Sequence, residues 1–155
     1  MTGTVEETYA AAIQHDLYAG DATLVGVVRS VGSADGTAER WTPRGRPMGW
    51  FHALVDENVV AVAPPEALLE ETKRRHEELK LAGMCDEEAH NAAWEETGFE
   101  RRYREHLDTD PDAQAAVEDL LARLRAGEDL ALVCFEGDAK RCHRHVLRER
   151  LRDRL

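Results

Sequence analysis

The side chains best suited to chemistry lie close together near the end of the chain, in the segment 134–145. This segment brings together thiol, carboxylate, guanidinium and imidazole groups, carried by Cys134, Glu136, Arg141, Cys142, His143, Arg144 and His145. Such a set supports three kinds of site: one that binds an anion, one that presents a reactive thiol, and one that holds a metal ion.

An anion site would use the start of the helix that we expect to begin near Cys142. Backbone N–H groups at a helix N-terminus are unpaired and attract phosphates and carboxylates. Arg141 and Arg144 would add charge-assisted hydrogen bonds, and Arg29, at the end of an earlier predicted strand, could point into the same crevice. Glu136 and His143 complete the set of predicted ligand-binding residues.

A thiol site would use Cys142 as its nucleophile. A cysteine at a helix N-terminus beside arginine and histidine is expected to favour the thiolate, which is the reactive form. Cys134, at the end of an apolar run, is more typical of a small core residue than of a catalytic one. Its role and that of Cys142, functional or structural, stay open from the sequence.

A metal site built from Cys134, Cys142, His143 and His145 is the least favoured alternative. Seven residues separate the two cysteines, and the chain has no second pair with C-x-x-C spacing. We therefore predict no metal ligands. Phosphate-loop, G-x-G-x-x-G and G-x-S-x-G motifs are also lacking, so the sequence indicates no particular cofactor.

The reactive segment needs a strand before it and a helix after it. Residues 130–135 form a short apolar run typical of a buried strand, and a helix is expected from about Cys142 through Leu151. A second continuously apolar run, 22–31, predicts another buried strand, adjacent and parallel to the first. In open α/β sheets the loops after the strands form the ligand crevice, which places the predicted site at the turn 134–145.

The remaining segments predict many helices and few strands. Helices are expected over 4–17, where Thr4 and Glu7 have capping-box spacing, then over 64–83, from Asp86 through Trp94, from Thr97 through Leu107, and from Asp110-Pro111 to Gly127. A short strand is expected over 59–62. Residues 32–65 are otherwise irregular, and their tryptophans and arginines fit a binding loop or a surface loop equally well. We predict one α/β domain over residues 1–155, with a small, mostly parallel sheet flanked by helices.

Composition narrows the class of protein. The net charge of -11 over 155 residues disfavours nucleic-acid binding through the overall surface. No long apolar segment or signal peptide is visible, which predicts a cytoplasmic protein without membrane spans, and three cysteines fit a reducing compartment. Only Lys73, Lys80 and Lys140 are lysines, and acid-rich, lysine-poor surfaces suit concentrated salt. We therefore expect a halophilic protein, with an ordinary acidic mesophilic protein as the alternative.

The C-terminal motif resembles a known family. Val133-Cys134-Phe135-Glu136 followed by Cys142-His143-Arg144 is similar to the signature of the family catalogued as domain of unknown function 488. The segments Asn91–Trp94 and Phe99–Leu107 resemble that family's aromatic helix, and Leu24–Arg29 resembles its first strand. Together with the composition, the resemblance suggests a haloarchaeal member of this family. It implies the location of a site but no reaction.

Two functions from different classes follow from these observations. The first is a site at 134–145 for an anionic, nucleotide-like small molecule, with thiol chemistry on Cys142. The alternative is a non-catalytic structural or protein-interaction module, in which the Cys-His-Arg residues tie the helix start to its neighbours.

Overall fold

The apolar run before the reactive segment forms the central strand of a parallel sheet. In the computed structural model, β4 (Leu130–Cys134) is buried along its whole length. It lies between β1 (Val5–Tyr9) and β2 (Thr23–Gly26), and β3 (Glu57–Asn58) pairs with the other edge of β2. All pairs are parallel, in the order β1-β4-β2-β3. The structure describes residues 2–15, 18–28, 54–134 and 140–155.

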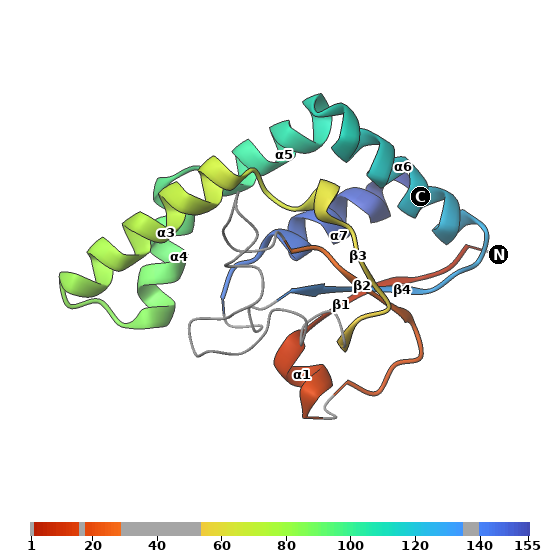
Figure 1. Cartoon of the computed structure of the whole chain (residues 1–155), viewed down its shortest axis with the longest axis horizontal. Coiled ribbons are helices and arrows are strands. Elements are labelled where there is room, and N and C mark those ends of the chain that lie inside the picture. The colour runs from red at the N-terminus through yellow and green to blue at the C-terminus, as the bar shows by residue number, and fades with distance from the viewer. Residues whose placement is uncertain (1, 16–17, 29–53, 135–139) are drawn as a thin grey trace, which may run out of the picture.

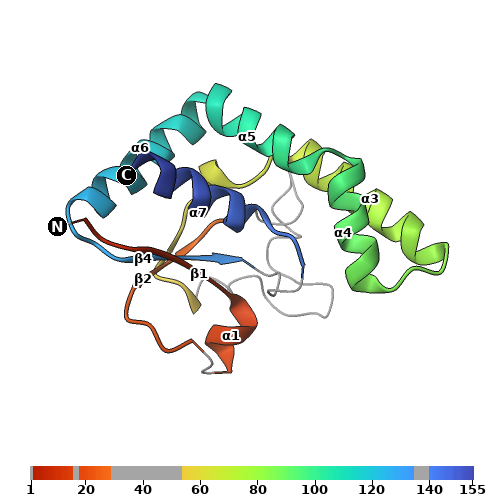
Figure 2. The same cartoon turned by 180° about the vertical axis from the view of Figure 1, so that it is seen from behind.

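Helices cover the sheet and extend beyond it. The described part of the chain contains the α-helices α1 (Ala10–Gln14), α3 (Glu66–Leu81), α4 (Asp86–Glu96), α5 (Phe99–Thr109), α6 (Pro111–Arg125) and α7 (His143–Arg154), and a 3-10 helix, η2, at Val60–Val62. Figures 1 and 2 show α5, α6 and α7 on one side of the sheet and α1 on the other. Helices α3 and α4 form a hairpin that projects away from the sheet; we call this hairpin the helical arm. The fold is a single α/β domain.

The core lies between the sheet and the helices on the α7 side. Leucines of α6 and α7 pack with those of β4, and all of them are buried: Leu120, Leu121, Leu124, Leu130, Leu132, Leu147 and Leu151. Each such side chain contributes about 1.5–3 kcal/mol through the surface that it removes from water. This packing fixes the position of α7 relative to the end of β4, where the predicted site lies.

The predicted pairing of the two apolar runs is confirmed. β2 and β4 are parallel neighbours, with Thr23 opposite Leu130 and Gly26 opposite Val133. The strand expected over 22–31 covers Thr23–Gly26, and the backbone N–H of Val27 continues the ladder to Val133 O at 3.1 Å. Arg29, expected at its end, lies outside the described residues.

The predicted N-terminal helix is wrong over its first half. Residues Val5–Tyr9 form strand β1, and only Ala10–Gln14 are helical. The N–H and hydroxyl of Thr4 both donate to Asp129 Oδ1, at 2.8 and 3.1 Å, so Thr4 does not cap a helix. Pairing with β4 overrides the local capping-box signal, because Val, Thr and Tyr fit a half-buried edge strand.

Of three further predicted elements or boundaries, the structure contradicts two and confirms one. Residues Val60–Val62, expected as a strand, form η2. Thr97 ends α4 instead of capping α5, whose first turn follows Gly98 with a φ of 62° that favours glycine. The start of α6 is as predicted: Asp110 Oδ2 accepts from Ala113 N at 2.9 Å, with Pro111 in the first turn.

None of the helices in the described part of the chain combines the length and the apolar character needed to cross a bilayer.

Candidate functional site

The end of β4 and the start of α7 bring the predicted residues of the Cys-His-Arg motif together. Cys134 is the last residue of β4, and Cys142 is the residue that precedes the first turn of α7. Cys142 has extended backbone angles, with φ -146° and ψ 147°, as a residue before a helix normally has. Cys134, Cys142, His143 and Arg144 are all buried. We call these four residues the buried cluster.

Arg144 lies at the centre of the buried cluster, with no surface exposed to solvent. Its Nη1 donates to Cys134 Sγ at 2.8 Å, and its Nε lies 3.4 Å from Glu7 Oε1. The guanidinium carbon lies 5.9 Å from the centroid of the Tyr9 ring. Glu7 and Tyr9 face the same side as their register partners Leu132 and Cys134, so Arg144 bridges β1 and β4. We expected Arg144 to project into a crevice, but it is an internal cross-link.

Glu7 is a member of the site that sequence reasoning missed. Besides Arg144, its carboxylate contacts Arg148 Nη1 at 3.3 Å and His145 Nδ1. Burial acts to raise the pKa of Glu7, but the hydrogen bond and charge of His145 and the charges of Arg144 and Arg148 outweigh it and lower the pKa. Glu7 is more than 130 positions from these partners, and only the correct assignment of β1 could have placed it here.

Cys142 and His143 form a thiol–imidazole pair. Cys142 Sγ lies 3.6 Å from His143 Nδ1, and His143 Nε2 lies 2.6 Å from the backbone oxygen of Val27. A carbonyl oxygen can only accept, so Nε2 carries the hydrogen and donates to Val27. In the neutral ring Nδ1 is then an acceptor facing the thiol. The ring also makes a T-shaped contact with the Tyr103 ring, at a centroid distance of 5.5 Å, and this contact helps to fix its orientation.

Burial controls the protonation of this pair. It lowers the pKa of His143 to about 4, so the imidazole is neutral near pH 7. It also raises the pKa of the Cys142 thiol well above its ordinary value, and the hydrogen bond and charge of Cys134 add to this effect. The expectation that Cys142 rests as a thiolate is therefore wrong, because desolvation outweighs the helix N-terminus and the nearby arginine.

The structure separates Arg141 from the buried cluster. Its backbone N–H donates to Asn91 Oδ1 at 2.9 Å, its backbone oxygen lies 2.8 Å from His90 Nε2, and its guanidinium pairs with Glu95 of α4. The guanidinium is half-exposed beside an open cavity of about 540 Å³ between α4 and Arg141, lined by Cys85, Glu87, Glu88, Asn91, Ala92, Glu95 and Arg141. Three carboxylates line this cavity, which makes it an unsuitable place for an anion.

The remaining predicted residues fall into two groups. Arg29 and Glu136 lie outside the residues that the structure describes. His145, a member of the alternative metal set, lies against Glu7. Across the described ranges, no three His, Cys, Asp or Glu side chains are arranged to hold a metal ion.

Comparison with known families gives one match. Residues 25–155 match a family model named DUF488-N3a and described as the active DUF488-N3 subclade. No curated protein and no solved structure matches the chain. The match includes β4, α7 and the whole buried cluster, whereas Glu7 and the rest of β1 precede it.

Proposed function

The chain belongs to the DUF488 family, and on that premise we propose that it is a thiol-dependent enzyme whose site lies at the carboxyl end of β4 and takes a small anionic, nucleotide-like substrate. The family resemblance predicted from Cys134, Glu136 and Cys142–Arg144 is confirmed by the match over residues 25–155. The matched subclade is described as active, which agrees with a catalytic role but names no reaction.

The observation that carries this proposal is the arrangement of Cys142, His143 and the backbone oxygen of Val27. A nucleophile within reach of a base, which a third group orients, is the general pattern of covalent catalysis by thiols and hydroxyls. Here Cys142 is the nucleophile, His143 Nδ1 is the base, and Val27 O holds the ring in the required tautomer. The thiol rests protonated, and its proton passes to His143 Nδ1 only as its sulfur attacks. Burial raises the pKa of the thiol and lowers that of His143, so it opposes this transfer in the resting protein, and the attack on the substrate has to drive it.

Basic side chains on α7 support an anionic substrate. Arg144, His145 and Arg148 converge on Glu7, in a protein whose net charge is -11. His145 and Arg148 keep 38% and 30% of their side-chain surface exposed, so an anion can reach them from solvent. The Arg148 guanidinium gives charge-assisted hydrogen bonds to phosphate or carboxylate oxygens, and the His145 imidazole adds a further hydrogen-bonding group.

A second candidate function rests on the burial of Arg144. Its guanidinium is fully buried and holds β1, β4 and α7 together through Glu7 and Cys134. In that case the buried cluster is a structural tie, and the chain is a non-catalytic module that contacts a protein partner.

Paired binding and melting measurements separate the two candidates. Inorganic phosphate and a nucleoside monophosphate are titrated into the parent, Arg148→Ala and Cys142→Ser, with Arg152→Ala, exposed on the same helix, as the matched control. The enzyme proposal predicts that Arg148→Ala weakens affinity about tenfold to a hundredfold, as expected for one charge-assisted hydrogen bond. Arg152→Ala and Cys142→Ser should leave binding unchanged.

The thermal melts of the same variants complete the comparison. An unchanged melt for Arg148→Ala with weakened binding supports a ligand site. A parent that binds neither probe, together with a lowered melt for Arg148→Ala, would replace the enzyme proposal with the structural one.

The composition supports a salt-rich cytoplasm as the setting. Acids outnumber bases by 31 to 20, and 17 of the 20 bases are arginines, since only three lysines occur. High salt screens the repulsion within such a surface. The dependence of the melting temperature on salt concentration tests this part of the proposal.

A further inference from the structure

The buried cluster contains two thiols that are neighbours in space. Cys134 ends β4 and Cys142 precedes α7, so the strand and the helix bring their sulfurs together within hydrogen-bonding reach. Neither cysteine is in a disulfide, and both are buried, with 1% and 3% of their surface exposed. The third cysteine, Cys85, is exposed on the helical arm. Two reduced thiols in contact inside a protein can form an intramolecular disulfide.

The two sulfurs have different partners. Cys142 Sγ faces the unprotonated Nδ1 of His143, which can take its proton. Cys134 Sγ instead accepts a hydrogen bond from the buried guanidinium of Arg144 at 2.8 Å. A cation beside a thiol favours its thiolate form. The pair therefore joins a sulfur with an adjacent base to a sulfur with an adjacent cation.

We propose that Cys134 is the resolving thiol of Cys142, and that the two form a reversible disulfide when Cys142 reacts with a hydroperoxide. This assigns a chemical role to Cys134 and to the contact between Cys134 and Arg144. This proposal rests on the proposed function in one respect, since it adds a form of regulation to that site. The disulfide consumes the thiol that the proposed reaction uses, so it inactivates the site. The disulfide itself forms independently of any substrate.

The first step oxidises Cys142 by two electrons. Its sulfur attacks the terminal oxygen of the hydroperoxide, a sulfur–oxygen bond forms, and the oxygen–oxygen bond breaks. His143 Nδ1 takes the thiol proton and passes it to the departing alkoxide, or to hydroxide when the oxidant is hydrogen peroxide. The products are the sulfenic acid of Cys142 and one molecule of alcohol or water.

The second step closes the disulfide. The Cys134 thiolate, held by Arg144, attacks the Cys142 sulfur, the sulfur–sulfur bond forms, and the sulfur–oxygen bond breaks. Hydroxide leaves and takes up the proton that Cys134 has released, giving water. In total, two thiols and one hydroperoxide become one disulfide, one alcohol or water, and one further water. An external dithiol such as dithiothreitol reverses the change.

The test oxidises the folded, full-length protein with hydrogen peroxide in a Cys85→Ser background. The protein should lose the mass of two hydrogen atoms, and peptide mapping without reductant should link Cys134 to Cys142 within one chain. Dithiothreitol should restore the starting mass. Cys134→Ser should instead accumulate a sulfenic acid on Cys142 that dimedone traps, and Cys142→Ser should oxidise much more slowly than the parent.

Substitutions of Arg144 extend the same experiment. Arg144→Lys keeps the cation and should close the disulfide faster than Arg144→Met, in which closure is expected to be about tenfold slower than in the parent. Near-ultraviolet circular dichroism establishes that both variants are folded. A link between two chains, a stable Cys142 sulfenic acid in the parent, or no oxidation short of unfolding would overturn the proposal. Each of these outcomes leaves the phosphate and nucleotide titrations unaffected, so failure here is distinguishable from failure of the proposed function.

Discussion

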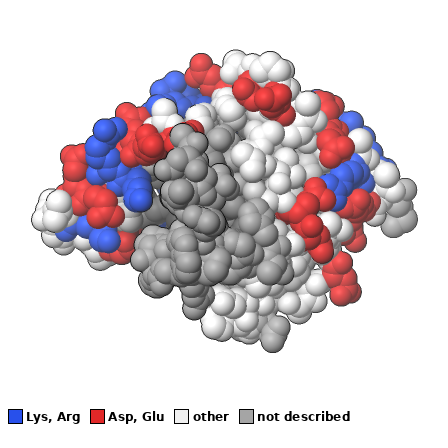
Figure 3. All heavy atoms as spheres, viewed as in Figure 1, with Lys and Arg blue, Asp and Glu red and all other residues white. Residues whose placement is uncertain are grey.

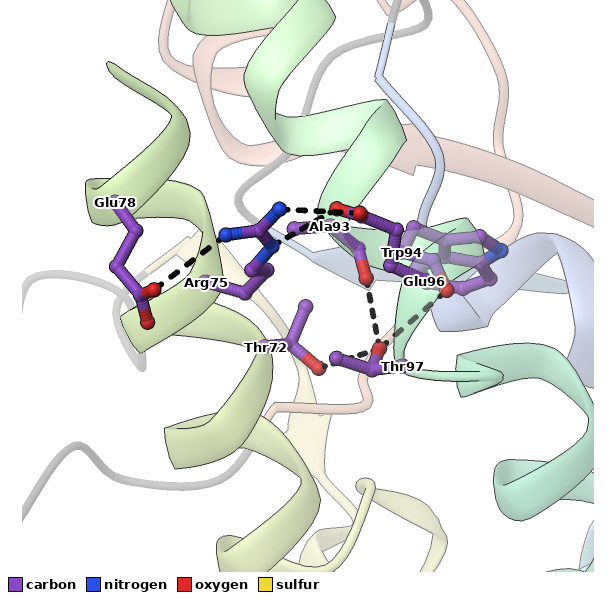
Figure 4. A network of polar contacts seen from close by, with 7 residues as sticks. All are labelled: Thr72, Arg75, Glu78, Ala93, Trp94, Glu96 and Thr97. Atoms are coloured by element: carbon purple, nitrogen blue, oxygen red, sulfur yellow. Dashed lines mark hydrogen bonds and ion pairs between the residues drawn. The ribbon is translucent and has the colours of Figure 1, made fainter. Parts of the chain in front are cut away.

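The buried cluster and the helical arm use the same residue types in opposite ways. Arg144 and Arg75 each hold a glutamate, but Arg144 is fully buried, whereas the Arg75 side chain is 38% exposed. Arg75 donates from Nε and Nη2 to Glu96 at 3.0 and 3.1 Å and contacts Glu78 at 3.4 Å, in a network that joins α3 to α4 (Figure 4). Water and ions compete for such a pair, so its net contribution is small.

Exposed ion pairs of this kind occur across the surface of the helical arm. Acidic and basic side chains alternate over it in Figure 3. Asp86, for example, meets Lys140, Lys80 and His76 at 2.5, 3.4 and 3.1 Å, and the hydrogen bond from Lys140 is the main cause that lowers the pKa of Asp86 to about 2. A charged pair on this arm maintains solubility and orientation. A charge inside the domain needs a partner, and removing that partner typically costs about 3–5 kcal/mol.

The two regions should differ most in the stability that is lost when one arginine is removed from each. Arg144→Met should lower the free energy of unfolding by about 3 kcal/mol or more, because it removes a fully buried cation that pairs with Glu7 and donates to Cys134 Sγ, and water cannot take its place. Arg75→Met, its counterpart on the arm, should leave the denaturation midpoint unchanged within error. Urea titration of both variants measures the difference, and equal effects would mean that burial does not distinguish the two regions.

The protonation of His143 should make stability depend on pH in the acid range. Its pKa in the folded protein, about 4, is below the ordinary 6.5, so as pH falls the unfolded chain takes up the proton first. The stability that the neutral ring provides is complete above pH 6.5 and is lost as pH falls toward 4, by about 3 kcal/mol.

His143→Gln isolates this contribution from that of the carboxylates. The glutamine amide can still donate to Val27 O but does not titrate. The slope of stability against pH between 6.5 and 4 should therefore be shallower in the variant. Identical slopes in the parent and the variant would show that His143 is not buried in its neutral form.

Removal of a tyrosine hydroxyl should show a smaller difference in stability between the interior and the surface. Tyr103, fully buried, donates its hydroxyl to Val62 O at 2.5 Å, and Tyr18 donates to Glu6 Oε2 at 2.9 Å near the surface. Tyr103→Phe should cost about 1 kcal/mol, because Val62 O loses its donor inside the protein. Tyr18→Phe should cost less, since water replaces the hydroxyl. Thermal melts of the two variants would contradict this account if Tyr18→Phe were the more destabilising.

Salt should act on the surface and leave the buried cluster unaffected. We expect the parent melting temperature to rise by a few degrees from low ionic strength to molar potassium chloride, because screening reduces repulsion among the acidic side chains. The destabilisation caused by Arg144→Met should be the same at both salt concentrations. A melting temperature that is flat or falls with salt would count against the halophilic interpretation.

The sequence predicted the centre of the fold better than its edge. The strand and helix around the motif, and the parallel pairing of β2 with β4, follow from continuous apolar runs and from the turn residues between them. Strand β1 was missed because Thr4 and Glu7 have the spacing of a capping box, whereas their real partners lie more than 120 residues away. Local patterns contain no information on such pairs.

The sequence indicated which residues of the motif lie together but not their protonation states. The motif identified Cys142, His143 and Arg144 correctly as neighbours, since they are consecutive. It could not reveal that Cys134 contacts Arg144, that Val27 O fixes the His143 tautomer, or that burial keeps Cys142 protonated. These properties depend on desolvation, which is set by the packing of the whole domain.

We claim that His143 activates the thiol of Cys142. The rate of Cys142 alkylation by iodoacetamide in the folded protein tests this claim. The rate is measured near pH 7 in the Cys85→Ser background, with peptide mapping to separate Cys142 from Cys134, and is compared with the rate of global unfolding. We predict modification of Cys142 that is faster than unfolding and much slower in His143→Gln, although that variant remains folded. Modification that occurs only at the unfolding rate, and equally in both proteins, would contradict the claim and leave the buried cluster as a structural tie.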